Sequence, residues 1–326
     1  MASQPRFIAK GCLSMMSQEL IAIMLGCIEP VPDLPMQFVT AQGYTALLDK
    51  RPAPLIKLPL SRTDVLRSAA ERQAWLECCM PYGTILPVCP NSFLTQADVP
   101  LMIAANLPLL DQLTLRLTGK TQFQITVSWD APQVLDRFRD APELAPLFAA
   151  GKTSADALQR GVTALSTRLR DDILDTLGNC AAEMLTLPPG QDMLANVVVL
   201  QQADKLPALD HALAQIDAIW TEGFRIKQIG PAPAASFASI ALQRVSQKDL
   251  TDAARLLGCN LDDTADKIAQ ARQQALKDTP ARAADIKESA DVLDAMARHG
   301  KGPQPLYLCS VRSDDQAATL PHRKVA

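Results

Sequence analysis

Aromatic residues and histidines are scarce in this chain of 326 residues. Aromatics make up 4% of the sequence, so alanine and leucine must fill most of the core. The three histidines, His211, His299 and His322, lie far apart, and none has a histidine or cysteine at metal-ligand spacing. The residues therefore predict no metal site and no cofactor.

Basic stretches and long hydrophobic runs are also missing. The formal net charge is −3, and no basic stripe with interleaved aromatics offers phosphate contacts, which argues against a nucleic-acid partner. The apolar run at residues 20–28 is far shorter than the roughly 20 residues that span a bilayer. Ser17-Gln18-Glu19 separates it from Arg6 and Lys10, and no cleavage site follows. We expect a buried strand there, with no membrane segment.

Cysteine is present but unorganised. Cys-x-x-Cys is absent from the eight positions, which are Cys12, Cys27, Cys78, Cys79, Cys89, Cys180, Cys259 and Cys309. Such scatter is typical of buried thiols in a reducing compartment. The sequence therefore predicts a cytoplasmic protein without a disulfide framework.

Catalytic motifs are absent as well. Gly151-Lys152-Thr153 and Gly119-Lys120-Thr121 end like phosphate loops, but Pro146 and Thr114 stand where the leading glycine belongs. Gly-x-Ser-x-Gly, His-Glu-x-x-His and dinucleotide fingerprints do not occur. The only local cluster of reactive residue types is Glu77, Cys78, Cys79 and Cys89. No catalytic residue is predicted.

The first half alternates short strands with helices. We expect strands at 20–28, 36–42, 44–48, 84–88 and 123–129. A helix capped by Ser61 or Thr63 should run to Cys79, with its inner side formed by Leu66, Ala69, Ala70 and Leu76. A second helix should begin at Asp98 and kink or break at Pro108.

The second half reads as a ferredoxin-like unit followed by helices. A helix at 154–185, a strand at 195–200, a helix at 204–220 and strands at 224–229 and 237–245 approach the ferredoxin-like order. Three further helices are expected at 248–257, 262–277 and 281–298, and one strand-like piece at 306–309.

These elements define the predicted fold class, α+β with two ferredoxin-like or modified ferredoxin-like domains and a C-terminal all-helical extension. The predicted boundaries are an N-terminal extension at 1–19, an N-terminal α+β domain at 20–130, a linker at 131–151, a C-terminal ferredoxin-like domain at 152–245, a helical extension at 246–300 and a tail at 301–326.

The most informative block is Gly230-Pro231-Ala232-Pro233-Ala234-Ala235-Ser236-Phe237. It resembles the closing Gly-Pro-Trp-Pro-Pro-Tyr-Ser-Phe signature of the gas vesicle protein L/F (GvpL/GvpF) family, with alanine in place of its Trp, second Pro and Tyr, and other blocks resemble the family in the same order. Thr84-Ile85-Leu86-Pro87-Val88 resembles the start of Val-Leu-Pro-x-Arg-Phe-Gly-Thr, but Cys89-Pro90-Asn91 follows. Further matching blocks lie at 20–28, 36–39, 44–48, 117–125 and 196–200.

The resemblance implies a non-enzymatic accessory or minor structural protein of gas vesicle assembly. Its partners would be the hydrophobic shell protein, kept from premature aggregation during nucleation, and other gas vesicle accessory proteins. The candidate partner-binding residues are Leu86, Pro87, Gly230, Pro231, Pro233 and Phe237. The alternative is a small-molecule enzyme on a ferredoxin-like scaffold, which would need a pocket that brings His211 beside Cys78, Cys79 or Cys89.

Overall fold

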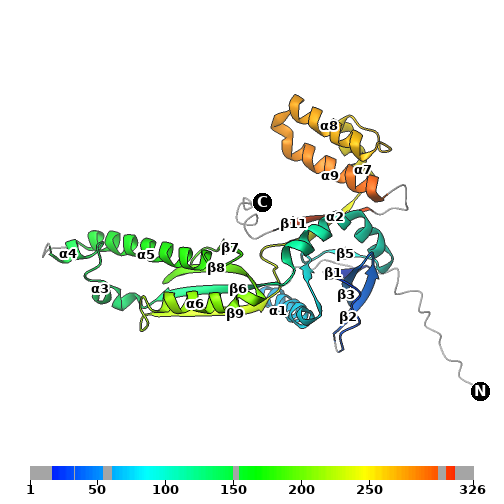
Figure 1. The fold of residues 1–326 in the computed structure, drawn as a ribbon. Coiled ribbons are helices and arrows are strands. Elements are labelled where there is room, and N and C mark those ends of the chain that lie inside the picture. Colours follow the sequence, from blue (N-terminus) through cyan, green and yellow to red (C-terminus); the bar gives the residue numbers. More distant parts are fainter. Residues whose placement is uncertain (1–16, 33, 54–60, 150–153, 300–305, 313–326) are drawn as a thin grey trace, which may run out of the picture. The chain divides into compact units, whose positions relative to one another are not determined.

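A computed structural model describes residues 17–32, 34–53, 61–149, 154–299 and 306–312. They form two compact units (Figure 1). Unit 1 combines the chain up to Thr118 with residues 238–312, and unit 2 is the intervening segment 119–237. Unit 1 is thus built from two stretches of chain far apart in sequence.

An antiparallel sheet forms the base of unit 1. Its strands are β1 (Gln18–Leu25), β2 (Met36–Ala41), β3 (Tyr44–Pro52) and β4 (Ile85–Pro87), in the order β2-β3-β1-β4, and β5 (Phe93–Leu94) also pairs with β1. Gln42 and Gly43 join β2 to β3 with φ of 51° and 79°, the left-handed pair that a two-residue hairpin requires. The strands expected at 36–42 and 44–48 correspond to β2 and β3. The buried strand expected at 20–28 instead ends at Leu25, which is exposed.

Helix α1 (Arg62–Cys79) covers this sheet with its C-terminal half only. It begins where the Ser61 Oγ accepts the Asp64 amide at 3.1 Å. Its buried side chains are Trp75, Leu76 and Cys79. The predicted inner side was wrong at Leu66, Ala69 and Ala70, which are exposed, because the buried stripe runs at i, i+3, i+4 and i+7 from Arg72.

Helix α2 (Val99–Leu117) runs through Pro108 without a break, contrary to one predicted outcome. Proline removes a single intrahelical hydrogen bond. Buried Leu110, Leu113 and Leu117 follow it and hold the last turns against the protein.

The second stretch of unit 1 begins and ends with a strand. Strands β10 (Ser239–Val245) and β11 (Leu306–Arg312) pair antiparallel. Between them lie α7 (Gln247–Leu257), α8 (Ala265–Asp278) and α9 (Ala283–His299), the predicted helical extension. Strand β10, which we expected in the C-terminal domain, instead lies beside the end of β4, where the Cys89 amide donates to the Ile240 carbonyl at 2.7 Å.

A buried asparagine joins α2 to β11. The Asn106 side chain donates to the Tyr307 carbonyl and accepts from the Cys309 amide, both at 2.8 Å. The Asn106 side chain thereby forms the two hydrogen bonds to the β11 backbone that a neighbouring strand would otherwise form. Asn106 itself is 3% exposed, so water cannot take over these bonds.

Replacing Asn106 with alanine should destabilise unit 1. The Tyr307 carbonyl and the Cys309 amide would lose their buried partner, which costs about 2–3 kcal/mol in the free energy of unfolding. Urea unfolding followed by circular dichroism measures this loss. The control is Gln274→Ala, which removes exposed hydrogen bonds to Asp278 and should cost below about 0.5 kcal/mol. Equal effects of the two changes would contradict the role of Asn106.

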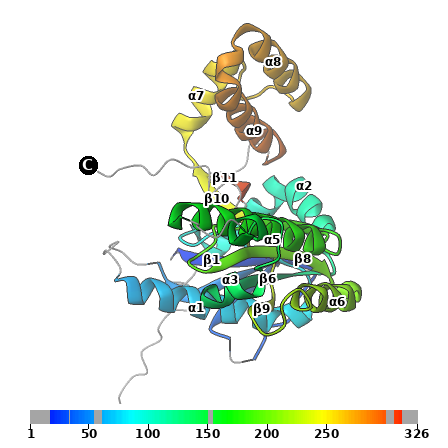
Figure 2. The same cartoon turned by 90° about the vertical axis from the view of Figure 1, so that its left-hand side faces the viewer.

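Unit 2 has its own sheet and core. Its elements are β6 (Lys120–Trp129), α3 (Val134–Arg137), α4 (Ala145–Ala149), α5 (Ala155–Gly178), β7 (Glu183–Thr186), β8 (Met193–Gln202), α6 (Leu206–Asp217) and β9 (Phe224–Ala232). The sheet is antiparallel in the order β7-β8-β6-β9. One core joins its strands to α5 and α6 (Figure 2).

Three predictions in this region need correction. Strand β6, expected at the end of the N-terminal domain, pairs with β8 and β9 of unit 2. Helix α5 ends at Gly178 rather than at 185, because the Ala182 amide donates to the Leu200 carbonyl at 2.9 Å and the chain enters β7. The described part of the expected linker, residues 131–149, packs on the core, with Val134 and Leu144 buried.

Short 3-10 turns complete the described elements, at Met80–Tyr82, Gln96–Asp98, Ala131–Gln133, Ala203–Lys205 and Pro280–Arg282. Among the helices that the structure describes, none is long and apolar enough to cross a membrane.

Candidate partner-binding surface

Four of the six predicted partner-binding residues are buried. Leu86 and Pro87 lie in β4, paired with Ile23 and Ala22 of β1. Pro233 and Phe237 are also buried, and only Gly230 and Pro231 are exposed. The four buried residues contribute to packing, Gly230 and Pro231 are accessible, and contact of the six residues with a partner stays a prediction.

The Gly-Pro segment is a continuation of a strand rather than a free connector. Gly230 and Pro231 lie in β9, joined by a cis peptide bond, and Ala232 pairs with Gln122 of β6. The following turn is fixed where the Ser236 amide donates to the Gln122 Oε1 at 3.0 Å. The segment is therefore attached to the sheet of unit 2.

Glycine is required at position 230 for two reasons. Its φ is +137°, and a Cβ there would stand 2.7 Å from the Phe123 ring and 2.8 Å from the Gln122 carbonyl. Both the backbone conformation and the lack of space exclude a side chain. This part of the family-like signature thus serves the fold.

Gly230→Ala should destabilise unit 2 by about 3 kcal/mol or more, since backbone strain and overpacking act together. Thermal unfolding measures the loss. Gly119→Ala is the control, because its φ of +71° also lies on the positive side, in the milder left-handed region, and nothing lies within 4 Å of the added Cβ. The control should lose only about 1–2 kcal/mol. Equal losses of stability in Gly230→Ala and Gly119→Ala would contradict the steric argument.

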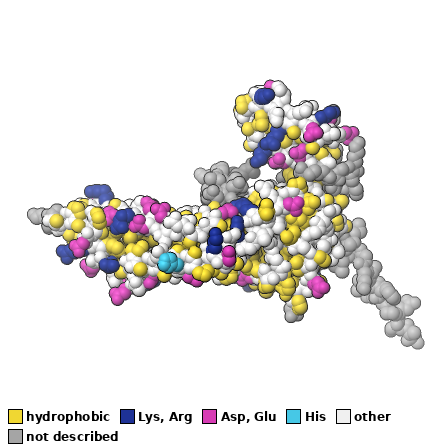
Figure 3. Space-filling model, in the orientation of Figure 1, with side chains coloured by type: hydrophobic (Ala, Val, Ile, Leu, Met, Phe, Trp, Pro, Cys, Tyr) yellow, Lys and Arg dark blue, Asp and Glu magenta, His cyan; other side chains and the backbone are white. Residues whose placement is uncertain are grey.

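An exposed apolar surface lies where β1 ends, and we call it the β1–β2 surface. It comprises Leu25, Cys27, Ile28, Pro30, Val31, Pro32 and Tyr82, and all but Leu25 line a shallow groove together with Glu29. Leu25 is 45% and Tyr82 49% exposed. The hydrophobic colour gathers over the neighbouring β2 and β3 as well (Figure 3). Because large apolar side chains are exposed here and Glu29 is the one charged residue of the groove lining, this surface is a candidate for protein contact.

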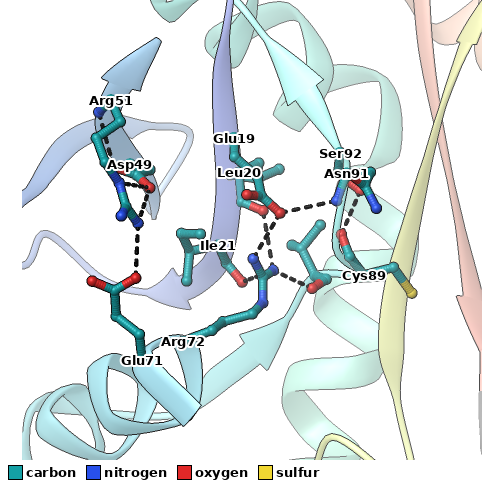
Figure 4. Close-up of polar contacts among 11 residues, drawn as sticks. Glu19, Leu20, Ile21, Asp49, Arg51, Glu71, Arg72, Cys89, Asn91 and Ser92 are labelled. Atoms are coloured by element: carbon teal, nitrogen blue, oxygen red, sulfur yellow. Dashed lines mark hydrogen bonds and ion pairs between the residues drawn. The ribbon is translucent and has the colours of Figure 1, made fainter. Parts of the chain in front are cut away.

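Beside β1, Arg72 holds the loop that follows β4. The guanidinium donates to the carbonyls of Leu20, Ile21 and Val88 and pairs with the Glu19 carboxylate at 3.0 Å (Figure 4). Glu19 also accepts the Asn91 amide at 2.9 Å. Burial lowers the pKa of Arg72 from its usual value, and the Glu19 charge partly offsets this.

This cluster lies where the sequence departs from the family motif, at Cys89-Pro90-Asn91. Sequence reasoning missed Arg72. The signal was its place on the buried stripe of α1, three and four residues before Trp75 and Leu76. A charged residue on such a stripe needs buried partners.

Arg72→Lys should cost about 2–3 kcal/mol of unfolding free energy. The guanidinium reaches the three carbonyls through Nη2, with its two hydrogens shared among them, and the Glu19 carboxylate through Nη1, whereas a lysine has a single nitrogen for both groups of partners. Urea unfolding provides the comparison. Arg67→Lys on the same helix is the control, since its ion pair with Asp64 is exposed and should contribute below about 0.5 kcal/mol. If Arg72→Lys leaves the free energy of unfolding unchanged, Arg72 does not hold the loop after β4 as described.

The cysteine cluster does not favour the enzyme alternative. Burial raises the pKa of Cys79 to about 11 and raises that of Cys89 above its usual value, so both thiols stay protonated at neutral pH. Cys78 is exposed, as is His211 on α6 of unit 2. Among the described residues no group of three or more histidine, cysteine or carboxylate side chains is arranged to hold a metal ion.

Comparison with known proteins identifies the class. Two solved structures share the fold. Gas vesicle protein GvpF from Anabaena sp. PCC7120 is 20% identical, with a TM-score of 0.53, over 67% of this chain and 96% of that chain. GvpF from Microcystis aeruginosa is 19% identical, with a TM-score of 0.50, over 68% and 98%. No curated protein matches.

The family model described as "Gas vesicle synthesis protein GvpL/GvpF" matches residues 26–239. The match covers more than half of the chain, and the predicted resemblance is thereby confirmed: this chain belongs to the GvpL/GvpF family of gas vesicle synthesis proteins. The matched range ends at the first residue of β10, so α7, α8, α9 and β11 lie outside it.

Proposed function

We propose that this chain is a non-enzymatic accessory or minor structural protein of gas vesicle assembly. In this role it binds the hydrophobic shell protein and prevents its premature aggregation during nucleation, in the cytoplasm and at the growing vesicle. Family membership supports the setting. The observation that carries the binding step is the exposed β1–β2 surface.

The chemistry of this surface suits an apolar partner. Leu25 and Tyr82 each expose nearly half of a large side chain, and tyrosine offers a rigid apolar ring with a polar end. Glu29 is the one charged residue in the groove lining, so few charges would be desolvated on contact. A shell subunit with exposed apolar surface aggregates unless such a surface covers it.

The exposed Gly230 and Pro231 offer a second contact point in unit 2. We further propose that unit 2 is a ferredoxin-like domain. Its strands and helices follow the order βαββαβ in an antiparallel sheet, with α3, α4 and α5 together in the first helical position. Unit 1 has the order βββαββα before the chain leaves it, which we interpret as a modified relative of that fold.

Shell protein co-expressed with this chain should stay soluble and be retained in a pull-down. The double variant Leu25→Lys with Tyr82→Lys places two charges on the β1–β2 surface. We expect it to weaken retention by at least roughly 10-fold, because two apolar contacts of about 1.5 kcal/mol or more are lost. Light scattering of the mixture should then rise as the shell protein aggregates.

The matched control is Val65→Lys with Leu66→Lys, which makes the same change at exposed apolar residues of α1. Circular dichroism checks that both variants fold. Loss of retention in the first variant only supports the proposed surface. Loss in the α1 variant only moves the site to α1, and absence of any shell-protein binding by the wild-type chain overturns the proposed function.

A further inference from the structure

Strand β2 is a sheet edge without the usual protection. It pairs with β3 alone among the described strands. Its sequence, Met36-Gln37-Phe38-Val39-Thr40-Ala41, contains neither charge nor proline. In unit 2, by contrast, edge strand β9 carries Arg225, Lys227 and Pro231, and edge strand β7 has four residues including Glu183. Proteins commonly guard exposed edges with such charges, prolines or short lengths.

The hairpin fixes which amides of β2 point outward. In a two-residue hairpin the closing pair, here Ala41 and Tyr44, is hydrogen-bonded, and such pairs alternate along the ladder. The Lys50 amide donates to the Pro35 carbonyl at 3.0 Å, which agrees with this phase. The backbone groups of Met36, Phe38 and Thr40 therefore face away from β3. No described residue forms a backbone hydrogen bond with this outer edge.

We propose that a second copy of this chain pairs with β2 in antiparallel orientation, with Phe38 on the twofold axis. In this register Phe38 faces the partner's Phe38, and Met36 faces the partner's Thr40. Each outward N–H of β2 in one copy then donates to an outward carbonyl of β2 in the other copy, and the twofold symmetry repeats each bond in the opposite direction. The inference is independent of shell-protein binding.

The side chains favour a self-complementary edge. An uncharged strand meets its own copy without repulsion between like charges. Met36 is buried and Phe38 is partly buried on one core cluster, so the two aromatic rings would extend the same apolar face across the axis.

The first test is the mass of the full chain by analytical ultracentrifugation. The wild-type chain should be a dimer, and Thr40→Pro should be a monomer with an unchanged circular dichroism spectrum. The Thr40 amide points outward, so proline removes a donor to the partner while the β2–β3 ladder stays intact. A wild-type monomer at high micromolar concentration, or a Thr40→Pro dimer, overturns the proposal.

The second test separates a second copy from any other strand. Phe38→Lys and Phe38→Glu should each weaken self-association at least 10-fold, and a mixture of the two should restore it as a heterodimer. Ile229→Lys and Ile229→Glu, at a half-exposed residue of β9, are the matched controls and should leave the dimer unchanged. Self-pairing is rejected if the mixture of the two Phe38 variants does not form a heterodimer. It is also rejected if the wild-type chain does not self-associate but binds a different gas vesicle protein, and Thr40→Pro abolishes that binding.

Discussion

The return of the chain to its N-terminal half is the constraint on which the structure depends. After unit 2 the backbone re-enters unit 1 at β10, where the Cys89 amide donates to the Ile240 carbonyl at 2.7 Å. It closes at β11, whose backbone is held by the buried Asn106 side chain of α2. Since a buried unpaired carbonyl or amide costs about 1–3 kcal/mol, these contacts favour keeping both stretches together.

The C-terminal helices are part of unit 1 rather than a separate extension. The apolar sides of α7, α8 and α9 share a core cluster with Ala105 of α2 and with Val245 and Leu306 of the two flanking strands. The extension lies outside the family match, yet it is integrated into unit 1 by packing and by hydrogen bonds. The family-like signature around Gly230 serves packing in a similar way, because its glycine makes room for Phe123.

Local pattern predicted most elements but not their partners. The strands expected at 36–42 and 44–48 were placed correctly as β2 and β3, because the glycine that separates them, Gly43, is a local turn signal. The boundaries failed at β6 and β10, since a strand's sequence does not state which distant strand it pairs with. In α1 the apolar side chains of Leu66, Ala69 and Ala70 suggested the wrong buried side. The side that is buried carries Arg72.

At the candidate site, too, the sequence predicted some features and missed those that depend on the folded chain. Motif order identified the family, but the motif residues Leu86, Pro87, Pro233 and Phe237 are buried. Leu25 was expected to be buried in the strand at 20–28, and Tyr82 gave no sequence signal, because exposure of an apolar residue depends on what the folded chain leaves uncovered. Arg72 could have been found from helical spacing alone, although its carbonyl partners could not.

Native-state hydrogen exchange at the Cys309 amide tests most directly whether the C-terminal stretch is integral to unit 1. That amide donates to Asn106, so it should exchange only when unit 1 unfolds, with an opening free energy within about 1 kcal/mol of that for the amides of β1. If β11 and α9 exchange several orders of magnitude faster while β1 stays protected, the extension is an appended element and the two stretches do not form one unit.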